Sequence, residues 1–115
     1  MTAPTIDRAT FDSLKQTAGV EFVLELVDTF LQEAPGMLDE LRSALAARDA
    51  DKFRRAAHSL KSNSNTFGAL TLGAMARELE LGGVGKAIER GGQPLDALVD
   101  EYARVATALT ALRHE

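Results

Sequence analysis

The chain has 115 residues, of which 45% are hydrophobic, and a formal net charge of -4 at pH 7. This length suits one compact domain with a real core and leaves little room for a second. The absence of cysteine excludes a disulfide framework and a cysteine zinc site, two distant histidines argue against a metal cluster, and the acidic balance argues against nucleic-acid binding.

The first predicted elements are a short helix at about residues 7–18 and a long helical stretch that begins near Val20. Ile6, Phe11 and Leu14 supply the apolar contacts of the short helix, which we expect to cover one end of a bundle. From Val20 onward one face is striped at helical spacing by Val23, Leu26, Val27, Phe30 and Leu31. The spacing continues beyond Pro35, which either kinks one long helix or opens a second one.

The second half of the chain reads as three further helices. Asp49 or Asp51 can cap the next helix, whose buried stripe is Phe53, Ala56, Ala57 and Leu60 and whose end is marked by a turn at Gly68. Another amphipathic helix follows until glycines at 82, 83 and 85 interrupt it, and we expect a flexible loop from Gly82 to Gln93. Pro94 suits the first position of the last helix.

Together these elements predict an all-α fold in one domain over residues 1–115. We expect an antiparallel up-and-down four-helix bundle over about residues 20–113, with a short additional N-terminal helix, because short connections favour antiparallel neighbours. Charged residues interrupt every hydrophobic segment and no signal peptide is recognisable, so the sequence predicts a cytoplasmic protein without a membrane span.

The stretch AAHSLKSNSNTFGA, residues 56–69, places His58 in the helix that Asp49 or Asp51 can cap. At about 100° per residue, His58 points roughly 140° away from Phe53, so we expect its ring to face solvent. Residues 52–61 contain no acidic side chain and four basic ones, Lys52, Arg54, Arg55 and Lys61. These cations disfavour the imidazolium, which keeps the ring neutral and able to attack phosphorus, and they favour an incoming phosphoryl group.

Other interpretations of these residues receive less support. Ser62 shares the face of His58, but an exposed helix surface offers neither an oxyanion hole nor a cleft for hydrolysis. The basic patch is short and lacks interleaved aromatics, so it does not indicate nucleic-acid binding. GGVGK at 82–86 lacks two residues of the phosphate-binding loop pattern. An ordinary surface histidine on a helical adaptor, which binds a partner by an amphipathic face, remains the alternative.

Over AAHSLKSNSNTFGA, and over ARELE from Ala76 to Glu80, the sequence resembles the histidine-containing phosphotransfer (HPt) domains of two-component phosphorelay signalling. The resemblance implies that His58 is the phosphoacceptor, that Lys61 contacts the phosphoryl group, and that Gly68 permits the turn after the active helix. It also implies that Glu80 orients the imidazole by accepting a hydrogen bond from its other nitrogen. Family members often have glycine where Ser62 stands, and this hydroxyl either hydrogen-bonds a phosphoryl oxygen or is simply exposed.

The function that the resemblance implies is that of a phosphorelay intermediate. His58 would accept a phosphoryl group from the aspartate of one receiver domain and pass it to the aspartate of another. The implied partners are receiver domains of response regulators and of hybrid sensor histidine kinases, with Arg54 and Arg55 as a basic rim that steers acidic receivers. We expect a monomeric phosphocarrier rather than an enzyme, with no cofactor or metal of its own because the receiver supplies Mg²⁺.

Overall fold

The computed structural model describes residues 5–114, and these form five helices without a strand. The all-α prediction is therefore confirmed. The single domain expected over residues 1–115 stays a prediction, since residues 1–4 and 115 lie outside the described part. The helices are α1 (Arg8–Ala18), α2 (Val20–Ala47), α3 (Ala50–Thr66), α4 (Leu70–Glu89) and α5 (Gln93–Arg113).

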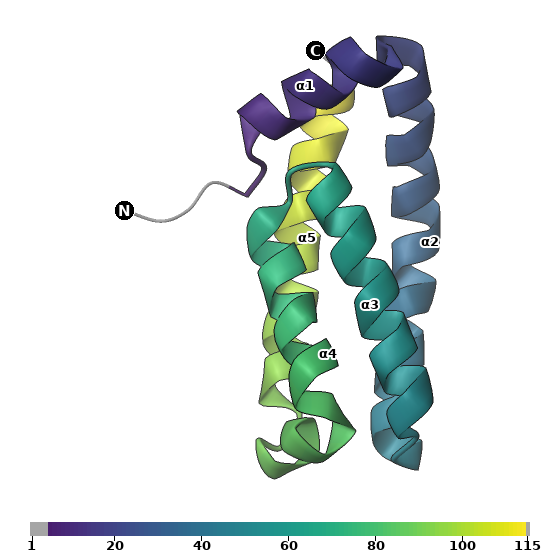
Figure 1. Ribbon diagram of the computed structural model, residues 1–115, viewed down its shortest axis with the longest axis vertical. Coiled ribbons are helices and arrows are strands. Elements are labelled where there is room, and N and C mark those ends of the chain that lie inside the picture. The colour runs from purple at the N-terminus through teal and green to yellow at the C-terminus, as the bar shows by residue number, and fades with distance from the viewer. Residues whose placement is uncertain (1–4, 115) are drawn as a thin grey trace.

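The four long helices lie side by side and are connected by short turns at alternate ends (Figure 1). The most extensive contact joins α3 to α4, and α3 also packs on α2 while α5 packs on α4 and α2. The short helix α1 lies across one end of this group, as the sequence predicts (Figure 1). Its Phe11 is fully buried. Each long helix therefore buries one face and leaves the other exposed.

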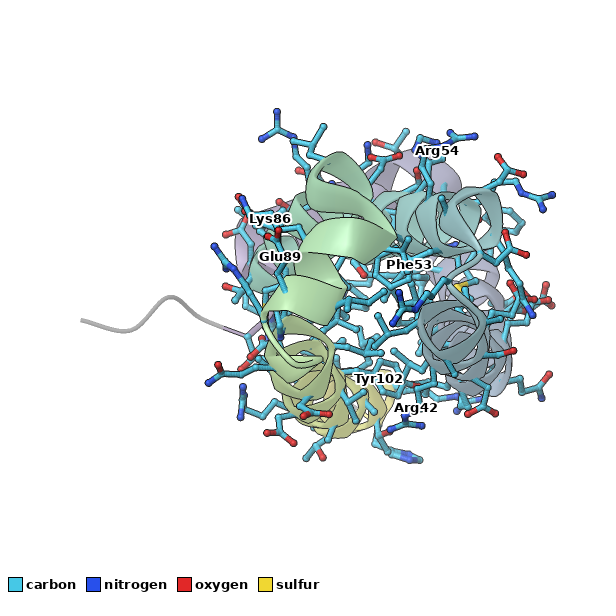
Figure 2. The ribbon with its side chains drawn as sticks, turned by 90° about the horizontal axis from the view of Figure 1, so that it is seen from below. Arg42, Phe53, Arg54, Lys86, Glu89 and Tyr102 are labelled. Carbon is cyan, nitrogen blue, oxygen red and sulfur yellow. The ribbon has the colours of Figure 1, made fainter. Side chains whose placement is uncertain are left out.

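The core consists of the apolar stripes that the helical period predicts. Figure 2 shows Phe53 pointing into the interior while the next residue, Arg54, points outward. Phe30 of α2 lies at the centre of an aromatic group, with ring centroids 5.5 Å from Phe67 and 6.0 Å from Tyr102. The largest fully buried side chains are Phe11, Phe53, Leu41, Leu60, Leu72, Leu98, Leu109, Val23, Val27, Val105 and Ser64.

Aspartate side chains cap two of the helices at their starts. Asp49 accepts a hydrogen bond from the backbone N–H of Lys52 at 3.1 Å, which identifies Asp49 rather than Asp51 as the cap of α3. Asp7 caps α1 in the same way through the backbone N–H of Thr10 at 3.3 Å. Both caps pair a donor that the first turn of a helix otherwise leaves unsatisfied. The starts of α1 and α3 therefore follow from local sequence.

Pro35 lies inside α2, which continues as one helix to Ala47. The alternative of a separate helix that opens at Pro35 is therefore wrong. The buried residues Ala34, Leu38 and Leu41 flank the proline on both sides. Their packing against the core offsets the loss of the backbone hydrogen bond that a proline removes from a helix interior.

The flexible loop predicted from Gly82 to Gln93 is wrong for most of its length. Helix α4 continues to Glu89 and is interrupted only at Gly83, whose φ of 75° and ψ of 177° are non-helical. Val84 and Ala87 explain the continuation because they are buried and hold this segment against the core. The connection to α5 is confined to residues 90–92, and α5 begins at Gln93, so that Pro94 takes the second position instead of the first.

The turn between α3 and α4 also seats the start of α1. Gly68 has a φ of 84°, and its carbonyl oxygen accepts a hydrogen bond from the backbone N–H of Asp7 at 2.8 Å. A Cβ atom at this position would lie 2.7 Å from the carbonyl oxygen of Asp7. Both the backbone conformation and the close approach therefore require glycine here. Within residues 5–114, no helix is both long enough and apolar enough to span a membrane.

Candidate functional site

His58 projects from the middle of α3 toward solvent. Its side chain is 56% exposed, while Ala57 and Leu60 on the opposite face of the helix are fully buried. This is the direction that the helical period predicts. A group that approaches from outside therefore meets the ring without displacing any core residue.

Glu80 of α4 reaches the inner nitrogen of this ring. Its Oε2 atom lies 2.6 Å from Nδ1 of His58, and its side chain is only 14% exposed. An ionised carboxylate can only accept hydrogen bonds, so in the neutral ring the hydrogen resides on Nδ1 and the lone pair on Nε2. Among residues 5–114, Nδ1 is the one ring atom of His58 that forms a hydrogen bond. The outward nitrogen is thus the nucleophilic one.

Lys61 binds the second oxygen of the same carboxylate. Its Nζ atom donates to Oε1 of Glu80 at 3.0 Å, and its side chain is 24% exposed. The hydrogen bond from Lys61 is the main reason that the pKa of Glu80 lies below its ordinary value. Burial opposes this effect, and the hydrogen bond with His58 lowers the pKa further. Glu80 is therefore ionised at neutral pH, as its contact with Nδ1 requires.

The close approach of α3 and α4 brings these groups together. Gly73 of α4 is buried beneath the side chain of Asn65, and a Cβ atom on Gly73 would lie 2.1 Å from Oδ1 of Asn65. Gly73 precedes Glu80 by seven residues and Asn65 follows His58 by seven, which is two helical turns in each case. The glycine contact and the histidine contact therefore belong to one seam between the two helices.

Arg54 and Arg55 are less available than the sequence indicates. Asp51 lies just before the basic stretch, and its carboxylate binds Arg54 at 3.0 Å and Arg55 at 3.1 Å. All three side chains are more than half exposed, so these pairs are solvated and weak. The expectation of a basic rim without an acidic member is therefore corrected: the rim contains Asp51, and the local excess of positive charge is smaller.

Ser62 and Gly68 occupy different places relative to the histidine. Ser62 is exposed one turn after His58, and its hydroxyl forms no hydrogen bond to any residue of the described range 5–114. Gly68 lies beyond the end of α3, at the turn that seats α1, and so acts on the fold rather than at the ring. Of the residues predicted for the site, His58, Lys61 and Glu80 are brought into contact.

The surroundings of His58 are open rather than enclosed. An open groove between α2 and α3 is lined by Ala56 and Ser59 of α3, the latter next to His58 in the sequence, and by Met37 and Glu40 of α2. The sequence analysis does not predict this groove, because it forms between two helices and Met37 at its edge is only partly buried. No group of three or more histidine, cysteine, aspartate or glutamate side chains suited to a metal ion occurs among residues 5–114.

The chain is similar to known proteins both in sequence and in fold. A family model described as Hpt domain matches residues 25–115. The sensor protein TorS of Escherichia coli (strain K12) is 31% identical over 113 residues, which make up 96% of this chain but only 11% of TorS. Histidine-containing phosphotransfer protein B (HptB) from Pseudomonas aeruginosa PAO1 is similar in structure, with a TM-score of 0.87 and 30% identity over 98% of this chain and 97% of that one.

A second solved structure shows a likeness of fold alone. It is the HPT domain of a sensor hybrid histidine kinase from Shewanella, with a TM-score of 0.73 and 20% identity over 94% of this chain and 92% of that one. The chain matches HptB and this domain over nearly their full lengths, and it spans about a tenth of TorS.

Proposed function

Since the chain belongs to the Hpt domain family, whose model matches residues 25–115, we propose that it is a phosphorelay intermediate with His58 as the phosphoacceptor. The observation that carries this proposal is the exposed ring whose Nδ1 lies 2.6 Å from Glu80. In this arrangement His58 takes a phosphoryl group from the aspartate of one receiver domain and delivers it to the aspartate of another. The chain acts as a phosphocarrier rather than as an enzyme.

The transfer step follows from the hydrogen on Nδ1. The lone pair of Nε2 attacks the phosphorus of an aspartyl phosphate, the N–P bond forms, and the acyl O–P bond breaks so that the aspartate leaves as a carboxylate. No proton has to depart, and the ring becomes a phosphoimidazolium with its hydrogen still on Nδ1. The carboxylate of Glu80 then lies against the new positive charge and stabilises it. Transfer to the next receiver reverses these bond changes.

The other site residues have supporting roles in this proposal. Lys61 and Ser62 contact the phosphoryl group, and Arg54 and Arg55 line the rim that faces an acidic receiver. The chain needs no metal or cofactor of its own, because the receiver brings the Mg²⁺ that neutralises phosphoryl charge. This division of labour accounts for an exposed histidine without a substrate cleft around it.

The setting of the relay is also part of the proposal. Two similar proteins carry the word sensor in their names, which favours receiver domains of hybrid sensor histidine kinases and of response regulators as partners. We infer that the chain works as a monomer in the cytoplasm. We also infer that the four long helices form an antiparallel up-and-down bundle, which the alternating ends of their connections support (Figure 1).

Phosphotransfer from a labelled receiver tests the proposal. Incubation with a phosphorylated receiver should give a labelled chain whose phosphoryl bond is labile in acid and stable in alkali. The His58→Gln variant should take up no label and keep its helical circular dichroism, because the side chain is exposed. The matched control is His114→Gln, which changes the other histidine of the chain and should be labelled normally.

Label in the His58→Gln protein would identify another acceptor and refute the assignment. Partner binding without label in any variant would favour the alternative, a helical adaptor that recognises its partner by an amphipathic face.

A further inference from the structure

Two donors share one carboxylate beneath the exposed ring of His58. Nδ1 of His58 lies 2.6 Å from one oxygen of Glu80, and Nζ of Lys61 lies 3.0 Å from the other. Lys61 and Glu80 are 24% and 14% exposed, so their pair lies in the seam between α3 and α4, below a ring that is 56% exposed. In the unphosphorylated chain, Lys61 is therefore committed to Glu80.

This arrangement is balanced only while the ring is neutral. Before phosphorylation, the cation of Lys61 compensates the anion of Glu80. A phosphoryl group on Nε2 brings roughly two negative charges near neutral pH, and the ring gains one positive charge. If Lys61 stayed on Glu80, the new cation of the ring would share its counter-ion with a second cation. The phosphoryl group would meanwhile have no cation of this chain in contact with it.

The neighbouring arginines do not resolve this imbalance. Arg54 lies one turn before His58, but Arg54 and Arg55 pair with Asp51, and within residues 5–114 neither contacts the ring or Glu80. Lys61 lies one turn after His58 and already touches the group that holds the ring. Its ammonium group sits on a flexible four-carbon stem, so a change of side-chain rotamer moves it while the backbone of α3 stays in place. Lys61 is thus the cation best placed to respond.

We propose that Lys61 exchanges partners during the carrier cycle, binding Glu80 before phosphorylation and the phosphoryl group on His58 afterwards. This inference rests on the proposed function. The exchange leaves Glu80 as the undivided counter-ion of the phosphoimidazolium and places the lysine cation on the phosphoryl oxygens. When the phosphoryl group departs, the ring loses its charge and Lys61 returns to Glu80. Lys61 is therefore a positioning residue in one state and a phosphoryl contact in the other.

Hydrogen-bond couplings in the NMR spectrum of the isotopically labelled full chain test this exchange. In the unphosphorylated chain, ¹⁵Nζ of Lys61 should show a coupling to the carboxyl carbon of Glu80. Phosphorylation of His58 with phosphoramidate, a small phosphoryl donor, should abolish that coupling and give one to ³¹P. Lys52 is the matched control, since it lies on the same helix and bonds the neutral hydroxyl of Ser43 at 3.2 Å. Its signal should be the same in both states.

The outcomes separate the two proposals. The exchange is overturned if Lys61 keeps its coupling to Glu80 after phosphorylation. It is also overturned if Lys61 shows no coupling to Glu80 in the unphosphorylated chain. A Lys61→Met chain should show the ring of His58 with hydrogen on Nδ1 and no ³¹P coupling to any lysine, and a ³¹P coupling to another lysine in that variant would also count against it. Phosphoramidate needs no receiver, so a failure of receiver transfer contradicts the proposed function without deciding the exchange.

Discussion

Replacing Gly68 by alanine should loosen the junction between α1 and the turn that follows α3. The φ of 84° at Gly68 costs an alanine about 1–2 kcal/mol, as a left-handed conformation does for any residue with a Cβ atom. The new Cβ would also lie 2.7 Å from the carbonyl oxygen of Asp7, which is backbone and cannot rotate away. The segment that enters α1 must therefore shift.

That shift adds to the loss of stability. It breaks the 2.8 Å hydrogen bond from Asp7 to Gly68, worth about 1 kcal/mol, and disturbs the burial of Phe11. We expect a total loss of about 3 kcal/mol in the free energy of unfolding. With a urea dependence of about 1–3 kcal/mol per molar, the midpoint should fall by roughly 1–3 M, measured by circular dichroism.

A second glycine separates the two contributions. Gly91 has a φ of 64°, but a Cβ atom there would have no neighbour within 4 Å. Gly91→Ala therefore carries the conformational cost alone, about 1–2 kcal/mol. The difference between the two variants measures the contact with α1. Equal losses for Gly68→Ala and Gly91→Ala would refute the argument from close approach.

Two further predictions concern α4. The pKa of Glu80 is lowered in the fold, so the pairing of its carboxylate stabilises the protein at any pH above the pKa of about 4.5 in the unfolded chain. This stabilisation is lost as the pH falls through the lowered pKa of the folded chain. Because Lys61 is the main cause, Lys61→Met should raise the pKa of the Glu80 carboxyl, and a ¹³C NMR titration that shows no rise would contradict this attribution. Gly85 is helical with open space around it, so Gly85→Ala should raise the free energy of unfolding by about 0.5–1 kcal/mol. A loss of stability in urea unfolding would show that the segment after Gly83 is not the helix described.

The spacing of apolar residues and the capping residues predict the fold correctly where helices are amphipathic and capped. Asp49 caps α3 and the stripe from Phe53 to Leu60 is buried, as spacing and capping rules predict. The same rules failed after Gly82, because three glycines in four residues outweighed the apolar character of Val84 and Ala87. Burial against a distant part of the chain decided that segment, and such burial has no local signature.

In the candidate site, too, features within one helix follow from the sequence, and contacts between helices do not. The outward direction of His58 follows from the period of a single helix. The pairing of Asp51 with Arg54 and Arg55 follows from spacings of three and four residues on one helix, which the sequence alone contains. The bond from Lys61 to Glu80 spans two helices. Spacing within one helix does not reveal it, because it depends on how α3 and α4 dock.

The contact between His58 and Glu80 joins residues 22 positions apart in the chain, on two helices. A copy of the protein in which α3 and α4 have separated still contains the histidine, but its ring is no longer fixed in one tautomer and has lost its counter-ion. Under the proposed function, the ability of His58 to carry a phosphoryl group therefore depends on the integrity of the fold at this seam. A copy with an open seam would lose phosphotransfer even though its histidine is still present.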